Sequence, residues 1–262
     1  MVEFLTVLFH QGLEYRTINV YRSAISPIDG TRVGQRKEVC LLLSGIDNLR
    51  PPIPKYNVIW EVDTVLGCLK ELKDDNNISD KDLTLKTVML MALTAIKRCS
   101  DLHLLDTRFM ALGEDKVRFK IMGKPKNFRN KGKMPEPVTY WVSGEELRPV
   151  STIRAYVDRT ETWRKENSET SFFLSFIQPH RAVTASTIGR WLKTVLGNVG
   201  VDTSKFTAHS TRSAASSKYK TLGASVSEIM KCGNWSSSST WQRFYHKPIT
   251  SGIREAQKSM LK

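Results

Sequence analysis

The sequence has few cysteines and no long apolar run. The four cysteines, Cys40, Cys68, Cys99 and Cys232, lie far apart and form no C-x-x-C pair, which argues against a zinc site or a disulfide scaffold. The longest apolar run, residues 87–96, is far shorter than the roughly 20 residues of a membrane span. No basic stretch followed by an apolar core opens the chain, so no secretory signal is visible. These absences predict a soluble intracellular protein with no metal site and no membrane partner.

What the chain has in excess is positive charge. Its 262 residues include 40 lysines and arginines against 26 aspartates and glutamates, a formal net charge of +14. Such an excess is typical of proteins that bind nucleic acid, although charge alone leaves anionic membranes and acidic partners open. The apolar content of 40% is ordinary for a globular protein of one large or two small domains.

Three prolines between residues 51 and 54 mark the clearest boundary in the chain, because prolines so close together cannot continue a helix. Helical spacing of apolar residues precedes them over residues 3–11, 17–24 and 37–49. We therefore predict a helical first domain with its linker over residues 1–54 and a larger domain over residues 55–262. About 50 residues is small for a free-standing domain, so we expect the first domain to be partial.

The larger domain is predicted to be mainly α with a small β-sheet. Ser79 and Ser225 each begin a capping box, which signals a helix start. Residues 107–142 have strand character, with a turn at residues 113–115. The predicted helices cover residues 60–72, 82–97, 100–105, 149–164, 187–196, 209–221 and 225–233, with a last turn from residue 239, and the predicted strands cover residues 117–121 and 138–141.

A basic stretch over residues 116–133 contains no acidic residue. A strand, loop and strand of this charge can lie along a DNA backbone, either as a specific element or as a solvated hairpin that contacts phosphates without specificity. A lysine at its tip could protonate a leaving oxygen, since crowded cations lower a lysine pKa. We choose Lys126 for this role, with Lys124 the next candidate. The other predicted DNA-binding residues are Lys116, Arg118, Lys120, Lys124, Arg129, Lys131 and Lys133.

Two arginines outside this stretch have neighbours suited to phosphate chemistry. Arg98 follows an apolar helix, and Asp101 lies three residues on, where its carboxylate could hold the guanidinium. His209 and Arg212 have i,i+3 spacing, which places both side chains on one face of a helix. Each pattern also has an ordinary explanation, a helix-terminal arginine in the first case and a basic surface pair in the second.

Aromatic residues near the end of the chain are the last candidates for the site. Trp241, Phe244 and Tyr245 have the spacing of a buried helix face, so Tyr245 stands out only through the residues before it. Trp235 could pack beside a phosphate and donate its indole N–H, or fill a core. Each observation alone is weak, but their order along the chain is specific.

In that order the chain resembles the tyrosine recombinases, or phage integrase family. The motifs that carry the resemblance are L-T-A-I-K-R-C-S-D-L, the region of Lys124 and Lys126, T-A-H-S-T-R, C-G-N-W-S-S and T-W-Q-R-F-Y-H-K-P. Segments such as Y-R-S-A-I-S, L-H-L-L-D-T-R-F-M and A-H-S-T-R-S-A-A-S-S-K look most similar to DIRS-type and Crypton-type mobile-element recombinases of eukaryotes. The similarity is strong over residues 60–248 and weaker before residue 50.

The resemblance implies a partial SAM-like core-binding domain followed by a catalytic domain that cuts and rejoins double-stranded DNA through a 3′-phosphotyrosyl bond. It implies Tyr245 as nucleophile, Arg98 and Arg212 as phosphate clamps, and His209 and Lys126 as proton carriers. Trp235 takes the place of a second histidine, and Asp101 supports its neighbours. No cofactor, metal or ATP is expected. Four protomers would act on two duplexes, with residues 249–262 docked on a neighbour or frayed.

Two other functions stay open at this stage. A type IB topoisomerase would share the arginines, the lysine and the tyrosine but act without joining two sites, and a domesticated protein would bind DNA without cutting it. We expect the protein in the nucleus if its host is eukaryotic and in the cytoplasm otherwise.

Overall fold

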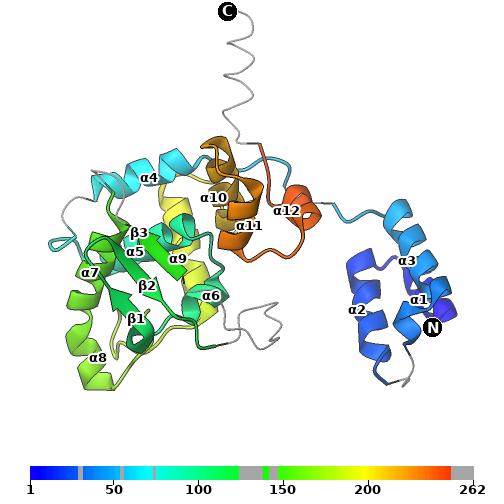
Figure 1. Cartoon of the computed structure of the whole chain (residues 1–262), viewed down its shortest axis with the longest axis horizontal. Coiled ribbons are helices and arrows are strands. Elements are labelled where there is room, and N and C mark those ends of the chain that lie inside the picture. Colours follow the sequence, from blue (N-terminus) through cyan, green and yellow to red (C-terminus); the bar gives the residue numbers. More distant parts are fainter. Residues whose placement is uncertain (29–31, 54–55, 73–74, 124–137, 142–146, 249–262) are drawn as a thin grey trace, which may run out of the picture. The chain divides into compact units, whose positions relative to one another are not determined.

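The chain divides into two compact units, Met1–Lys55 and Tyr56–Lys262. The structure is a computed structural model that describes residues 1–28, 32–53, 56–72, 75–123, 138–141 and 147–248 (Figure 1). Among the helices of these residues, none is long and apolar enough to span a bilayer.

The first unit is a small helical cluster. It contains α1 (Val2–His10), α2 (Tyr15–Ile25), the short 3-10 helix η1 (Val33–Gln35) and α3 (Lys37–Leu49). Each of the three α-helices lies within two residues of its predicted range. The apolar faces meet in a core of Leu5, Leu8, Ile18, Val39, Leu43 and Ile46. That this unit is part of a core-binding domain stays a prediction.

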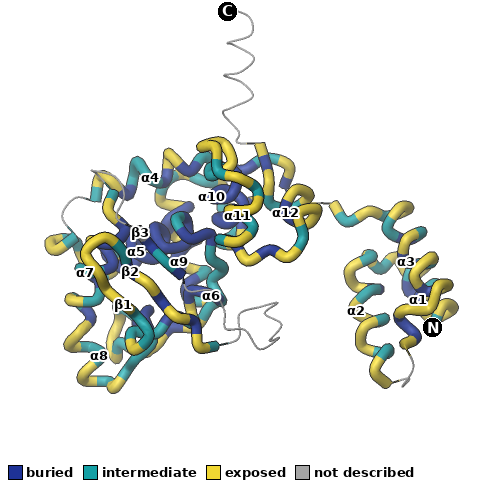
Figure 2. The backbone as a smooth tube through the Cα atoms, viewed as in Figure 1, coloured by how far each residue is buried: buried dark blue, intermediate teal, exposed yellow. Residues whose placement is uncertain are grey.

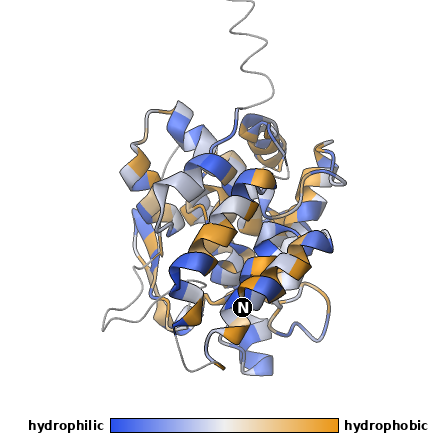
Figure 3. Ribbon diagram, turned by 90° about the vertical axis from the view of Figure 1, so that its right-hand side faces the viewer, coloured by the Kyte–Doolittle hydropathy of each residue, from blue (hydrophilic) through white to orange (hydrophobic). Residues whose placement is uncertain are grey.

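The second unit is mainly helical with one small sheet, as predicted. Its elements in chain order are α4 (Val62–Glu71), α5 (Asp80–Thr94), α6 (Cys99–His103), η2 (Thr107–Phe109), β1 (Met110–Leu112), β2 (Lys116–Phe119), β3 (Val138–Trp141), α7 (Pro149–Arg159), α8 (Glu161–Asn167), α9 (Ala185–Asn198), α10 (Ser210–Thr221), α11 (Val226–Gly233) and α12 (Ser238–Phe244). In Figure 3 hydrophobic and hydrophilic residues alternate along many of the helices, the pattern of elements that bury one face.

The three strands form an antiparallel sheet in the order β1-β2-β3. Val117 pairs with Leu112 on one side and with Tyr140 on the other. Because side chains alternate along a strand, Val117 and Phe119 are buried whereas Arg118 is exposed. One face of β2 therefore belongs to the core and the other presents charge.

Helix α5 runs through the centre of the second unit. Residues 83–93 are all buried, and α5 packs against α7, α9 and α10 (Figure 2). Its polar residues are satisfied locally: Thr87 Oγ1 donates to the Leu83 carbonyl at 2.7 Å, and Lys86 forms an ion pair with Asp75 at 2.8 Å. Because α5 is packed on all sides, it holds the turn that leads to α6 in a defined position.

Two predicted helices end differently in the structure. The helix predicted over residues 82–97 stops at Thr94, because Ile96 turns into the left-handed region with a φ of 51° and the Lys97 amide closes the turn on the Ala92 carbonyl at 3.3 Å. The helix predicted over residues 149–164 is two helices. The Thr160 hydroxyl donates to the Tyr156 carbonyl at 2.7 Å, a bond that bends a helix.

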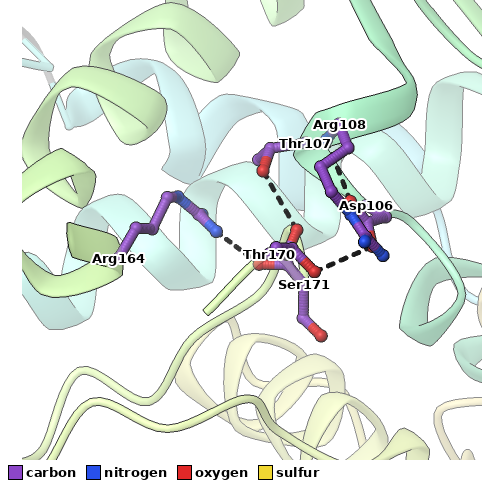
Figure 4. Close-up of polar contacts among 6 residues, drawn as sticks. All are labelled: Asp106, Thr107, Arg108, Arg164, Thr170 and Ser171. Carbon is purple, nitrogen blue, oxygen red and sulfur yellow. Dashed lines mark hydrogen bonds and ion pairs between the residues drawn. The ribbon is translucent and has the colours of Figure 1, made fainter. Parts of the chain in front are cut away.

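The root of the sheet is tied to the segment after α8 (Figure 4). Asp106 accepts hydrogen bonds from Arg108 Nη2 at 2.8 Å and from Thr170 Oγ1 at 3.0 Å, and Thr107 Oγ1 donates to the Thr170 carbonyl at 3.0 Å. Arg164 donates to the Ser171 carbonyl. This network fixes the point from which β1 and β2 leave the helical body.

Candidate active site

The turn between α5 and α6 presents Arg98 at the start of α6. The Arg98 amide donates to Asp101 Oδ2 at 3.1 Å, so the Asp101 carboxylate satisfies the amide of the N-cap residue of α6. The guanidinium of Arg98 lies 3.5 Å from the same oxygen. Ile96, a β-branched residue at positive φ, is a costly way to make this turn, so the strain lies immediately before the site.

Arg212 is the most deeply buried charge of the site. Its side chain is 1% exposed, on the first turns of α10. Its Nη2 donates to the Gly233 carbonyl at 2.6 Å, at the C-terminus of α11. Its guanidinium carbon lies 4.2 Å from the ring centre of Trp235 and 5.5 Å from that of Tyr245. Carbonyl, indole and phenol together fix this guanidinium in place.

Asp101 lies between the two guanidinium groups. Its Oδ2 is 3.5 Å from Arg98 Nη1 and 3.8 Å from Arg212 Nη1, and its side chain is 5% exposed. Burial lowers the pKa of Arg212 to about 10, and the neighbouring charge of Arg98 adds to this, while Tyr245 and Asp101 oppose it. The guanidinium therefore stays charged at neutral pH.

Several donors of this cluster are buried without a hydrogen-bond acceptor anywhere in the described part of the chain: Arg98 Nη1, Arg212 Nε and Nη1, and Trp235 Nε1. Buried donors without acceptors are costly and rare in folded proteins. Their concentration at one place indicates a site for an anion with several oxygens, such as a phosphate.

His209 and Tyr245 form the second half of the site. His209 precedes α10 and Tyr245 follows α12, and a hydrogen bond of 3.0 Å joins His209 Nε2 to the Tyr245 hydroxyl. His209 is exposed and Tyr245 is half-buried. An imidazole at this distance can accept the proton of the phenol when the phenol acts as a nucleophile.

Trp235 packs over Arg212 because the helix before it ends in glycine. Asn234, in the left-handed region with a φ of 54°, turns the chain, and the indole lies where a side chain of Gly233 would be. A Cβ at Gly233 would meet the Trp235 ring at 2.0 Å. The rings of Trp235 and Tyr245 meet edge to face, with centres 4.8 Å apart.

The backbone around Tyr245 is tied to its own unit. Ser217 Oγ on α10 donates to the Tyr245 carbonyl at 3.3 Å and accepts from the Lys247 amide at 2.9 Å. The Ile59 amide donates to the Pro248 carbonyl at 3.0 Å. The tyrosine thus meets the arginines of its own chain.

A pocket of about 370 Å³ unites these groups. The predicted residues that line it are Arg98, His209, Arg212 and Tyr245, with Asp101 and Trp235 in contact with them. The predicted proton donor Lys126 lies outside the described residues, as do Lys124, Arg129, Lys131 and Lys133. Of the remaining basic residues, Arg118 and Lys120 are exposed on or just after β2, and Lys116 is half-buried.

Sequence reasoning missed three residues around the pocket. Lys97 lines it, the Gly233 carbonyl holds Arg212, and Ser217 holds the Tyr245 backbone. Gly233 acts through its backbone carbonyl, which every residue type has, and Lys97 and Ser217 act through common polar side chains, so no residue pattern marked these three positions. Within the described residues, no group of three or more His, Cys, Asp and Glu side chains could hold a metal ion.

Known proteins resemble this chain in sequence pattern and in fold. The sequence profile of the phage integrase family matches residues 66–249. The chain belongs to the phage integrase family. No curated protein sequence matches this family member.

Solved recombinase structures share the fold of this phage integrase family member. The XerA recombinase has a TM-score of 0.55 at 16% identity, over 99% of this chain and 90% of that one. The Tn1549 transposon integrase in complex with transposon right end DNA has a TM-score of 0.61 at 15% identity, over 100% and 84%. The XerH site-specific recombinase in a post-cleavage complex with a palindromic difH substrate has 0.59 at 14%, over 100% and 71%.

Proposed function

We propose that this protein cuts and rejoins DNA strands through a covalent bond between Tyr245 and a 3′ phosphate. The observation that carries the proposal is the pocket itself. A phenol, hydrogen-bonded to an imidazole at 3.0 Å, lies beside two arginines whose buried donors lack acceptors among the described residues. Membership of the phage integrase family supports the same chemistry.

In the first step the Tyr245 oxygen forms a bond to phosphorus, and its proton passes to His209 Nε2. The bond from phosphorus to the 5′ oxygen breaks, and that oxygen leaves as a hydroxyl after it receives a proton. Arg98 and Arg212 bind the two non-bridging oxygens, on which charge accumulates as the phosphorane forms. In the reverse step a 5′ hydroxyl attacks the phosphotyrosine and gives its proton to the group that protonated the 5′ oxygen. The bond from phosphorus to the Tyr245 oxygen breaks, and that oxygen takes its proton back from His209. The covalent bond conserves the energy of the original linkage, so no metal ion or nucleotide enters the scheme.

The donor to the 5′ oxygen is assigned to Lys126 on its place in the basic stretch. Trp235 packs on Arg212 and offers its indole N–H to a phosphate oxygen. An indole neither releases nor accepts a proton at neutral pH, so proton transfer falls to His209 and the lysine.

Double-stranded DNA is the proposed partner. The Tn1549 integrase was solved in complex with transposon right end DNA and XerH with a palindromic difH substrate, and this chain carries a net charge of +14. Arg118 and Lys120 face outward from β2 and its end. Phosphate contacts release counterions, so binding should weaken steeply with salt. A flat salt response, or unchanged affinity in Arg118→Glu with Lys120→Glu, would contradict the assignment of β2 to the DNA interface.

A DNA substrate with a nick next to the cleavage site tests the central proposal. The fragment released after cleavage diffuses away, so the covalent adduct accumulates. We expect an adduct with the unaltered protein and none with Tyr245→Phe. Tyr219→Phe, which loses a hydrogen bond to the Thr94 carbonyl, is the matched control and should still form the adduct. Binding without any adduct in the unaltered protein would support the domesticated, non-cutting alternative.

We further propose that strand exchange takes place in a tetramer on two duplexes, and that the protein serves a mobile element related to the DIRS-type and Crypton-type recombinases. The motif segments around residues 21–26, 102–110 and 208–218 support the second point, and with a eukaryotic host the nucleus would be its location. Joining of two labelled duplexes, with a synapse of four protomers by light scattering, is expected. Nicking and resealing by a monomer would instead favour the type IB topoisomerase.

A further inference from the structure

Lys97 lies at the pocket and has no role in the scheme above. In the sequence it lies between Ile96 and Arg98. Ile96 has a left-handed backbone conformation, which turns the chain at this point. It lines the same pocket as Arg98, Arg212 and Tyr245. Its Nζ donates to the Cys232 carbonyl at 2.7 Å, one residue before the carbonyl that holds Arg212.

The C-terminus of α11 therefore holds two cations on successive carbonyls. This is the negative end of the helix dipole, where cations are favoured. An ammonium has three N–H donors, and the Cys232 carbonyl accepts one of them. Within the described residues no carboxylate forms an ion pair with Lys97. Burial lowers the pKa of Lys97, and Arg212 and Arg98 lower it further, against the opposing effects of Cys232 and Asp101.

The net charge of these side chains can be compared with the charge of the bound phosphate before and during the reaction. Arg98, Arg212 and Asp101 together carry one net positive charge, which matches a phosphodiester with its single negative charge. Attack by the phenolate oxygen converts this phosphodiester to a phosphorane with two negative charges on its non-bridging oxygens. With Lys97 the cluster carries two positive charges and matches the phosphorane. Two groups are left out of this count: His209, whose imidazole faces the Tyr245 hydroxyl, and Lys126, which the scheme assigns to the 5′ oxygen rather than to the non-bridging oxygens.

We propose that Lys97 is a third phosphate-binding cation of the active site, whose ammonium offsets the charge that appears on the scissile phosphate only during strand cleavage. The proposal rests on the proposed function. Because a group that matches the transition state better than the substrate raises the rate more than the affinity, Lys97 should contribute little to DNA binding and much to cleavage.

Lys97→Met tests this with the nicked substrate. We expect the single-turnover cleavage rate to fall about 10- to 100-fold, the effect of losing one charge-assisted hydrogen bond, while affinity for uncut DNA changes less than about threefold. Lys97→Arg keeps the charge and should recover most of the rate. Lys165→Met, on the exposed face of α8, is the matched control and should cleave like the unaltered protein. Thermal unfolding of each variant reports whether the fold is intact.

A substrate with a methylphosphonate in place of the scissile phosphate separates charge from tethering. This group lacks the charge of one non-bridging oxygen, so the penalty of Lys97→Met should shrink at least about tenfold relative to the normal substrate. An equal penalty on both substrates would show that Lys97 only ties α11 in place and would overturn the proposal. So would a normal cleavage rate in Lys97→Met. Absence of cleavage by the unaltered protein would instead count against the proposed function.

Discussion

In the arginine half of the pocket the side chains are buried and held by several contacts, whereas in the phenol half they are accessible and meet through one hydrogen bond. Arg212 is 1% exposed and Asp101 5% exposed, while His209 is exposed and Tyr245 half-buried. The half that stabilises charge gains from being fixed before DNA arrives, since fixed dipoles and charges need no reorganisation during the reaction. In the proposed reaction the Tyr245 oxygen must reach a phosphate and later release it, which requires freedom of movement.

The largest expected effect tests the fixed half. Arg212→Lys keeps the charge but loses the planar fork that reaches Gly233, Asp101 and the phosphate. We expect the cleavage rate on the nicked substrate to fall about a thousandfold. Arg190→Lys on α9 is the matched control, since Arg190 lies on an exposed helix face and donates to Thr187, and it should cleave normally. Cleavage by Arg212→Lys within tenfold of normal would mean that charge alone suffices.

The next effect concerns stability rather than rate. Asp101→Asn removes the carboxylate between two guanidinium groups and leaves them to repel each other. We expect the free energy of unfolding to fall by about 3 kcal/mol in chemical denaturation. Asp158→Asn, at an exposed position of α7, should change it by less than about 0.5 kcal/mol. Added inorganic phosphate should restore part of the unfolding free energy of Asp101→Asn, because the anion can lie between the two guanidinium groups, and should not change that of Asp158→Asn.

The accessible half should respond the other way, with a loss of rate and little loss of stability. His209→Gln keeps a polar group near Tyr245, but the glutamine amide cannot take up a proton at neutral pH. Cleavage should fall about 100-fold, and the unfolding free energy should change by less than about 0.5 kcal/mol because the side chain is exposed. A large drop in stability would show that the imidazole is part of the fixed half after all.

A smaller effect addresses the contact between the halves. Gly233→Ala places a Cβ against the Trp235 ring, so the indole must move off Arg212. Such overpacking should lower the unfolding free energy by about 2 kcal/mol. Gly67→Ala on α4, where an added Cβ meets nothing within 4 Å, should instead stabilise the protein by up to about 1 kcal/mol. Calorimetry on both variants gives the comparison.

The smallest effect falls on the backbone that carries the nucleophile. Ser217→Ala removes two hydrogen bonds to the segment around Tyr245 and should cost about 1 kcal/mol of stability. We expect a threefold to tenfold loss of cleavage rate. Ser216→Ala, one residue away, where the hydroxyl donates to the Ser213 carbonyl, should leave the rate unchanged. An equal loss of rate in both variants would show that Ser217 has no specific role at the site.

Helix starts were predictable from the sequence, and some helix ends were not. Ser79 and Ser225 cap α5 and α11 as predicted. A cap is readable from the sequence because the capping serine and the acidic residue three positions later form a short local motif. The end of α5 depends on Ile96 at a positive φ, a conformation that its β-branched side chain disfavours, so only tertiary packing explains it. The break at Thr160 likewise follows from a side chain bonding to its own helix.

Arg98, His209, Arg212 and Tyr245, which the sequence singled out together, line one pocket, whereas Lys97 and the groups that support the pocket were missed. Order along the chain singled out Arg98, Arg212 and Tyr245 because reactive side chains have distinct chemistry. The carbonyls that hold Lys97 and Arg212 belong to Cys232 and Gly233, and every residue has a carbonyl, so no residue type announces this role.

The hydrogen bond between Ile59 and Pro248 joins the entrance of the second unit to the stretch just past the nucleophile. This hydrogen bond ties the first residues of the second unit to Pro248, three residues after Tyr245. In chain order, residues 56–59 and this hydrogen bond come before the buried helix α5. Residues 56–59 are therefore linked by a backbone hydrogen bond to the segment that carries Tyr245.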